Sequence, residues 1–153
     1  MKIRLSLALL ALTVVAGPGI RAGDAPPAAQ EEKPETELEQ TMGRMNKAWR
    51  QVRKAAREGK LAPATAALVA TVRTNAEAAA KLTPALETEQ PAAARAKFHA
   101  DFQAQLKRLT GTLARLEAAL QANDTAGAAK LVGEVGEVMK SGHHDFKKPE
   151  KKE

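Results

Sequence analysis

Residues 97–120, "KFHADFQAQLKRLTGTLARLEAAL", carry the longest helical pattern of the chain. Apolar side chains recur there every three or four positions, at Phe98, Phe102, Leu106, Leu109, Leu113, Leu116 and Leu120. This spacing places them on one face of an α-helix. Proline suits the first turn of a helix, so Pro91 marks the start. The sequence therefore predicts one long amphipathic helix over residues 91–121.

Three further segments have the same periodicity. In residues 36–58 the apolar positions are Leu38, Met42, Met45, Trp49, Val52 and Ala56. In residues 62–83, which we expect Pro84 to end, they are Leu68, Val72, Ala76, Ala79 and Leu82. The last segment begins at an N-cap, Asp124 or Thr125, runs to about residue 147 before Pro149, and carries Val132, Val135, Met139, His143 and Phe146. With short connections and no competing strand pattern, residues 36–148 predict an all-α fold, an antiparallel up-down-up-down four-helix bundle.

The two ends of the chain differ from this pattern. Residues 1–22 combine a basic start, the apolar run "LSLALLALTVVAG" and a small residue, Ala22, at the expected cut. They predict a secretory signal peptide and a periplasmic protein, with no membrane insertion after cleavage, because the apolar run is far shorter than the roughly 20 residues of a span. Residues 23–35 are rich in Pro, Ala and Glu and predict a disordered leader. Residues 149–153 form a charged tail.

Charge and cysteine content limit the possible functions. The whole chain has 24 basic and 18 acidic residues, a net charge of +6. Lys2, Arg4 and Arg21 leave with the signal peptide, so the mature chain has 24 − 3 = 21 basic against 18 acidic residues, or +3. So weak a charge, on an exported protein, argues against nucleic acid as a partner. There is no cysteine, so packing or a bound ligand has to hold the domain together.

Two adjacent histidines lie near the end of the last helix. His143 falls within the apolar row and is expected to point into the bundle, whereas His144 lies about 100° further round and faces water. A single histidine on an apolar face is more often a packed core residue than a ligand, so both readings stay open. In an antiparallel bundle, Met42, Phe98 and Phe102 would meet His143 at one end. A thioether facing an imidazole in an apolar, aromatic cleft is a ligand pair for haem iron in electron-transfer cytochromes.

Three stretches resemble the cytochrome b562 family, within the wider group of cytochrome c′-like bundles: "LEQTMGRMN" (38–46), "KFHADF" (97–102) and "MKSGHHDFK" (139–147). The resemblance covers the chain from about Leu38 to Lys148. It implies that Met42 and His143 are the axial ligands of a haem iron. It also implies that the haem pocket is lined by Leu38, Met45, Phe98, Phe102, Phe146 and Lys147.

Relatives that bind haem c carry Cys-x-x-Cys-His at the last stretch, where this chain has Met139 and Gly142 in the cysteine positions. The resemblance therefore implies haem b, held without a covalent bond. In the family motif the ligand histidine directly follows the second cysteine position, which is Gly142 here, so the resemblance also selects His143 over His144. It implies a small electron carrier that is not an enzyme, passes electrons to partner redox proteins, and is a monomer or a weak dimer.

A different class of function is also open. A haem-free helical periplasmic protein could bind a transition metal through "GHHDF", or help other proteins to fold; a purely structural adaptor is a weaker alternative. His143, His144 and Asp145 support the metal site, although adjacent positions on a helix are poorly placed for joint ligation. None of the three histidines has the serine or cysteine neighbour that nucleophilic catalysis would need, so we predict no enzymatic activity.

Overall fold

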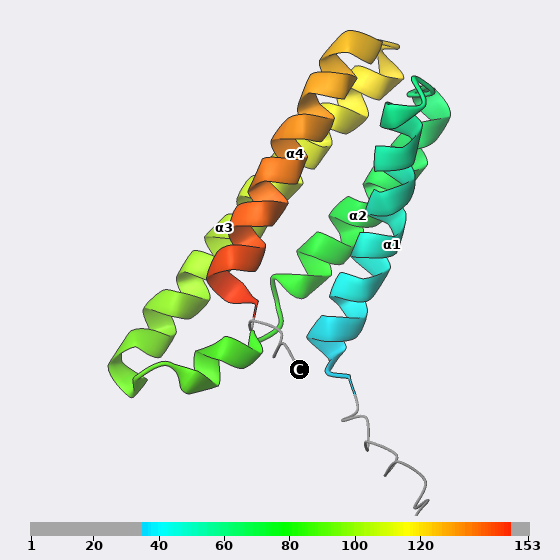
Figure 1. The fold of residues 1–153 in the computed structure, drawn as a ribbon. Coiled ribbons are helices and arrows are strands. Elements are labelled where there is room, and N and C mark those ends of the chain that lie inside the picture. Colours follow the sequence, from blue (N-terminus) through cyan, green and yellow to red (C-terminus); the bar gives the residue numbers. More distant parts are fainter. Residues whose placement is uncertain (1–34, 148–153) are drawn as a thin grey trace, which may run out of the picture. The chain divides into compact units, whose positions relative to one another are not determined.

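The computed structural model describes residues 35–147 (Figure 1). The predicted signal peptide, nearly all of the predicted leader and the charged tail lie outside the described residues, so they stay predictions. Residues 35–147 form four α-helices, two short 3₁₀ helices and no strand. This confirms the predicted all-α class and the four helices. In this part of the chain, no helix combines the length and the apolar character that crossing a bilayer requires.

Helix α1, Glu37–Arg57, has ends that its sequence explains. The Thr36 hydroxyl accepts a hydrogen bond from the Glu39 amide (3.2 Å), and the Glu39 carboxylate accepts one from the Thr36 amide (2.7 Å), so the two residues form a capping box. Beyond the last turn, Gly59 has a φ of +64°, a left-handed conformation that favours glycine. The observed bounds lie within one residue of the predicted 36–58.

Helix α2, Ala66–Ala79, is shorter than the predicted 62–83. It is preceded by the 3₁₀ helix η1, Pro63–Thr65, and it ends five residues before the expected stop (84 − 79). Pro84 is fully buried with an extended backbone, so the residues between Ala79 and Pro84 form the turn that brings its ring into the core. The buried positions are Val69, Val72, Ala76 and Ala79; Val69, not the predicted Leu68, begins the row.

Helix α3, Ala92–Gln121, agrees with the predicted 91–121, and Pro91 is its N-cap residue. From Phe102 to Leu120 every apolar residue of the predicted row is buried. In the connection before α3, Ala85–Glu89 form the 3₁₀ helix η2, which the sequence pattern did not predict. Arg95 donates hydrogen bonds to the Thr88 and Gln90 carbonyls (both 3.1 Å), which ties this connection to the first turns of α3.

Helix α4, Thr125–Phe146, begins at Asp124, whose carboxylate accepts a hydrogen bond from the Gly127 amide (2.8 Å). Its buried face is made of Ala128, Leu131, Val135 and Val138. Most of the predicted row is therefore displaced from the centre of the buried face: at 100° per residue, Val132, Met139, His143 and Phe146 are centred about 70° around the helix from it. Of these, Val132, Met139 and Phe146 are half-buried and His143 is exposed.

Consecutive helices pack together, α1 on α2, α2 on α3 and α3 on α4, whereas α1 and α4 touch far less (Figure 1). The α2–α3 contact includes an ion pair between Arg73 Nε and Glu117 Oε1 (2.8 Å). The pKa of the Arg73 guanidinium group is raised, mainly by its hydrogen bond to Glu117 and to a smaller extent by its hydrogen bond to Glu77. The weak α1–α4 contact leaves the functional site between the first and last helices.

Candidate functional site

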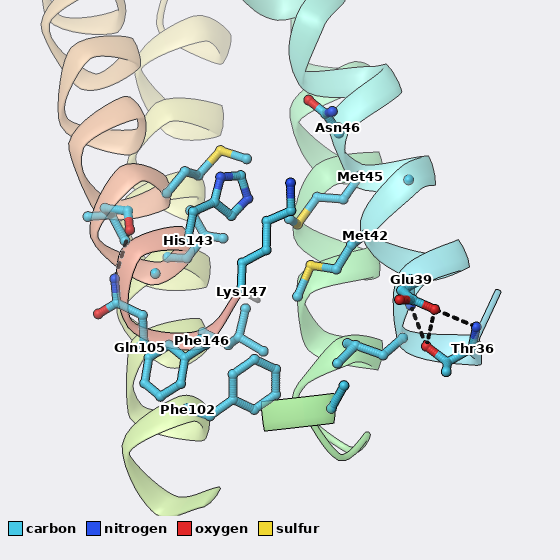
Figure 2. A pocket seen from close by; sticks show the side chains of 18 residues that line it. Thr36, Glu39, Met42, Met45, Asn46, Phe102, Gln105, His143, Phe146 and Lys147 are labelled. Carbon is cyan, nitrogen blue, oxygen red and sulfur yellow. Dashed lines mark hydrogen bonds between the residues drawn. The ribbon is translucent and has the colours of Figure 1, made fainter. Parts of the chain in front are cut away.

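A cavity of about 500 Å³ with mainly apolar walls lies between α1, α3 and α4 (Figure 2). The start of α1 and the end of α4 form its two sides, and the middle of α3 closes it. Its lining comprises Thr36, Leu38, Glu39, Met42, Gly43, Met45, Asn46, Ala85, Phe102, Gln105, Leu106, Leu109, Val138, Met139, Gly142, His143, Phe146 and Lys147. Seven of the eight residues predicted for the site are among them; the exception is Phe98.

The α1 side of the cavity is formed by three of the predicted residues, Leu38, Met42 and Met45. They are spaced by four and three positions, so they share the side of α1 next to the core. Met45 is 3% exposed and belongs to the core, whereas Met42 is half-buried. In Figure 2, Met42 and Met45 point from α1 towards the helix that carries His143.

On the α4 side, His143 lines the cavity and its imidazole points across it towards α1 (Figure 2). It is exposed, which corrects the expectation that it points into the packed interior: the helix turns it to the open seam beside the core. Within residues 35–147 its ring makes no hydrogen bond, unlike the rings of His99 and His144. A histidine packed in the core would be buried and its ring nitrogens would be hydrogen-bonded, so His143 is not a core histidine.

His144 has a separate environment. Its side chain is 87% exposed and its Nδ1 lies 2.8 Å from an oxygen of Asp145. It does not line the cavity, so the two histidines do not form one site. No group of three or more His, Cys, Asp or Glu side chains that could hold a metal ion occurs in the described part of the chain.

Three aromatic rings gather at the end of the cavity. Phe102 is 3% exposed and lines it together with Phe146. The Phe146 ring meets Phe102 edge-on at 5.5 Å between centroids and meets Phe98 in the same way at 5.2 Å. Phe98 is not part of the lining, because it lies one turn before Phe102 and behind Phe146. Phe98 therefore packs against Phe146 from outside the cavity and does not contact the cavity itself.

Among the lining residues that were not predicted for the site, two matter most for its structure and chemistry, Gln105 and Met139. Gln105 donates a hydrogen bond from Nε2 to the Val138 carbonyl (2.7 Å), joining α3 to α4, and its Cγ lies 3.4 Å from where a Cβ on Gly142 would be. The spacing of Phe102, Gln105 and Leu109 could have placed it on the lining face. Met139, considered only as the stand-in for a cysteine, adds a third thioether to the wall.

The cavity lining thus includes one imidazole and three thioethers, besides the polar side chains of Thr36, Glu39, Asn46 and Gln105 and the cationic C-cap residue Lys147. Imidazole and thioether are typical axial ligands of haem iron. No curated protein and no solved structure matches the chain. The sequence profile of the family described as cytochrome b562 matches residues 37–147, nearly the same residues that form the four helices. The chain belongs to the cytochrome b562 family, whose members are haem-binding electron-transfer proteins.

Proposed function

We propose that this protein is an exported one-electron carrier that holds one non-covalent haem b between Met42 and His143. The observation that carries the proposal is the placement of the two side chains: a thioether from α1 and an imidazole from α4 point into one apolar cavity from opposite sides (Figure 2).

The cavity and its walls fit a haem group. A volume of about 500 Å³ lies within the range of cofactor pockets, and an apolar interior with few polar groups is typical of them. The chain has no cysteine, so a covalent thioether attachment is excluded and burial with axial ligation has to retain the group. The seam between α1 and α4 is wide enough for the cavity because these helices make few other contacts.

Each residue has a task in this proposal. Haem supplies the one-electron iron couple. Met42 and His143 would hold the iron, and the thioether would favour its ferrous state. Phe102, buried at the end of the cavity, excludes water. The ammonium group of Lys147 offsets the negative charge of a propionate.

The proposal has further parts that concern the whole protein. The helices follow one another in up-down-up-down order, which is supported by the packing of each helix on the next and by connections of few residues. The protein works in the periplasm, as the sequence of residues 1–22 suggests, as a monomer or weak dimer that exchanges electrons with other redox proteins.

Visible spectroscopy of two matched variants tests the ligand. The protein is purified from haem-supplied cells as the wild type, His143→Ala and His144→Ala. We expect the wild type and His144→Ala to show a sharp Soret band and a reducible α-band. His143→Ala should bind haem about ten- to hundredfold more weakly and lose the α-band, because one axial ligand is gone.

A wild type that cannot be titrated with haem would contradict the function. Loss of the α-band in His144→Ala, with its retention in His143→Ala, would keep the function and transfer the ligand to the other histidine. Circular dichroism of both variants controls for folding, since both positions are exposed and neither substitution removes a core side chain.

A further inference from the structure

The exposed surface of α1 carries a run of basic residues that has no counterpart elsewhere in the described chain. From Arg44 to Arg57 the helix has no acidic residue, and all its basic residues are exposed: Arg44, Lys47, Arg50, Arg53, Lys54 and Arg57. The two acidic residues of α1, Glu37 and Glu39, are both in the first turn. The helix is therefore strongly basic beyond the cavity.

Three of these residues continue the row of α1 that borders the cavity. Glu39, Met42 and Asn46 line the cavity, and Arg50, Arg53 and Arg57 follow at spacings of four, three and four. At 100° per residue, all six positions fall within a sector about 80° wide. The guanidinium groups of Arg50, Arg53 and Arg57, here named the arginine row, thus extend along the seam directly from the cavity.

The arginine row is not used for internal ion pairs. Among residues 35–147, Arg50, Arg53 and Arg57 form no ion pair, although other arginines do: Arg73 with Glu117 and Arg115 with Glu134. On α4, Met139 and His143 line the cavity, and the same side of the helix continues through Gly136 and Val132, so this row contains no carboxylate. The row is left open to an external group.

Only Arg57 of the arginine row, in the last turn of α1, is placed to interact favourably with the helix dipole. Arg53 lies three residues from Arg50 and four from Arg57, so these positive charges are neighbours on the helix surface and repel each other. Stability alone would favour neutral or acidic residues at some of these positions. A function outside the helix accounts for the arrangement better than a structural role does.

We infer that the arginine row is the docking surface for a partner redox protein with an acidic face. This inference rests on the proposed function, because it explains why the charges begin at the edge of the electron-carrying site. Arginine forks pair with carboxylates, and complementary charge speeds the encounter of proteins more than it raises their affinity. A protein is favoured over a lipid surface because the exposed positions of the row have no apolar or aromatic residues between them for insertion.

Two triple variants separate local charge from net charge. The first is Arg50→Gln, Arg53→Gln and Arg57→Gln. The control is Lys81→Gln, Lys107→Gln and Lys130→Gln, which removes the same three charges from exposed positions on other elements, where these lysines also form no ion pair among the described residues. The arginine-row variant should melt close to the wild-type temperature, because the relief of repulsion between like charges offsets the loss of the Arg57 cation from the last turn of α1.

The probe is a plant-type [2Fe–2S] ferredoxin with an acidic surface. Calorimetry measures binding of the oxidised ferredoxin at low ionic strength, and stopped-flow absorbance measures the transfer of one electron from the reduced cluster to the ferric haem iron. We expect both the affinity and the rate constant to fall at least tenfold in the arginine-row variant and less than threefold in the control. The wild-type rate constant should also fall as salt is added.

Equal losses in the two variants, or no binding by the wild type, would overturn the docking surface. Binding of phosphatidylglycerol vesicles to the wild type, lost in the arginine-row variant while ferredoxin is not bound, would overturn it in favour of a membrane. Calorimetry needs no haem, so a protein that loads none yet binds through the row would contradict the proposed function and support the docking surface.

Discussion

At the scale of single residues, the cavity offers more than one thioether. Met45 is buried in the core, and Met139 lies one helical turn before His143, on the same side of the cavity. Met42 is the half-buried thioether that comes from the opposite helix. An axial pair needs ligands on opposite faces of the ring, so this geometry favours Met42, the residue that the family resemblance also selects.

Three conservative variants distinguish the thioethers. Met42→Leu, Met45→Leu and Met139→Leu keep most of the side-chain volume and should each cost less than about 1.5 kcal/mol of folding free energy. Only Met42→Leu should lower the reduction potential and weaken haem binding, because it alone removes a ligand that favours ferrous iron. Potentiometric titration of the three proteins tests this; an unchanged potential in Met42→Leu would exclude it as the ligand.

At the scale of the helix, α4 contains glycines in two kinds of environment. A Cβ added at Gly133 would meet no atom within 4 Å. A Cβ added at Gly127 would overlap the carboxylate of Asp124, the group that caps the helix. The first glycine therefore weakens the helix without a packing reason, and the second leaves room for the cap.

Alanine substitutions at these glycines should differ in effect. Gly133→Ala should raise the free energy of unfolding by about 1 kcal/mol, the difference in helix propensity. Gly127→Ala should bring little or no gain, because a displaced Asp124 cap costs about 1 kcal/mol and offsets the propensity. Urea unfolding of the two variants and the wild type measures the difference; equal gains would contradict the role of the cap.

The helices were largely predictable because amphipathic periodicity and end signals agree. Thr36, Pro91 and Asp124 all lie where the chain enters a helix. Helix phase was less predictable on α2 and α4, where small residues such as Ala128 form much of the buried face and blur its centre. Periodicity cannot tell a core face from a cavity face next to it, which is why His143 was expected inside and lies exposed. The η2 turn has only a local signal, Pro84, and was missed.

At the scale of the whole molecule, packing is uneven around the bundle. The pairs α1–α2, α2–α3 and α3–α4 are extensive, and the seam between α1 and α4 is the weak one. Seven of the eight predicted site residues line the cavity at this seam, where a bound group would add the contacts that the protein itself does not make. Their grouping could be foreseen from the order of the helices, but the place of Phe98 behind Phe146 depends on side-chain packing that periodicity does not give.

Haem binding should therefore stabilise the whole fold. With free haem at a hundred times its dissociation constant, binding to the native state alone adds about 2.7 kcal/mol to the free energy of unfolding. Chemical unfolding of the wild type with and without haem measures this gain. His143→Ala should show little of it at the same haem concentration, and an equal gain in that variant would mean that burial without ligation holds the group.

The two proposed ligands lie far apart in the order of synthesis. Met42 is in the first helix and His143 in the last turn of the fourth, a separation of 143 − 42 = 101 residues. A nascent chain thus carries the thioether early but gains its counterpart only after another 101 residues have been added. A fragment that ends before residue 143 would have one ligand and no opposing one. Tight haem binding therefore distinguishes chains that contain both ligands from truncated ones.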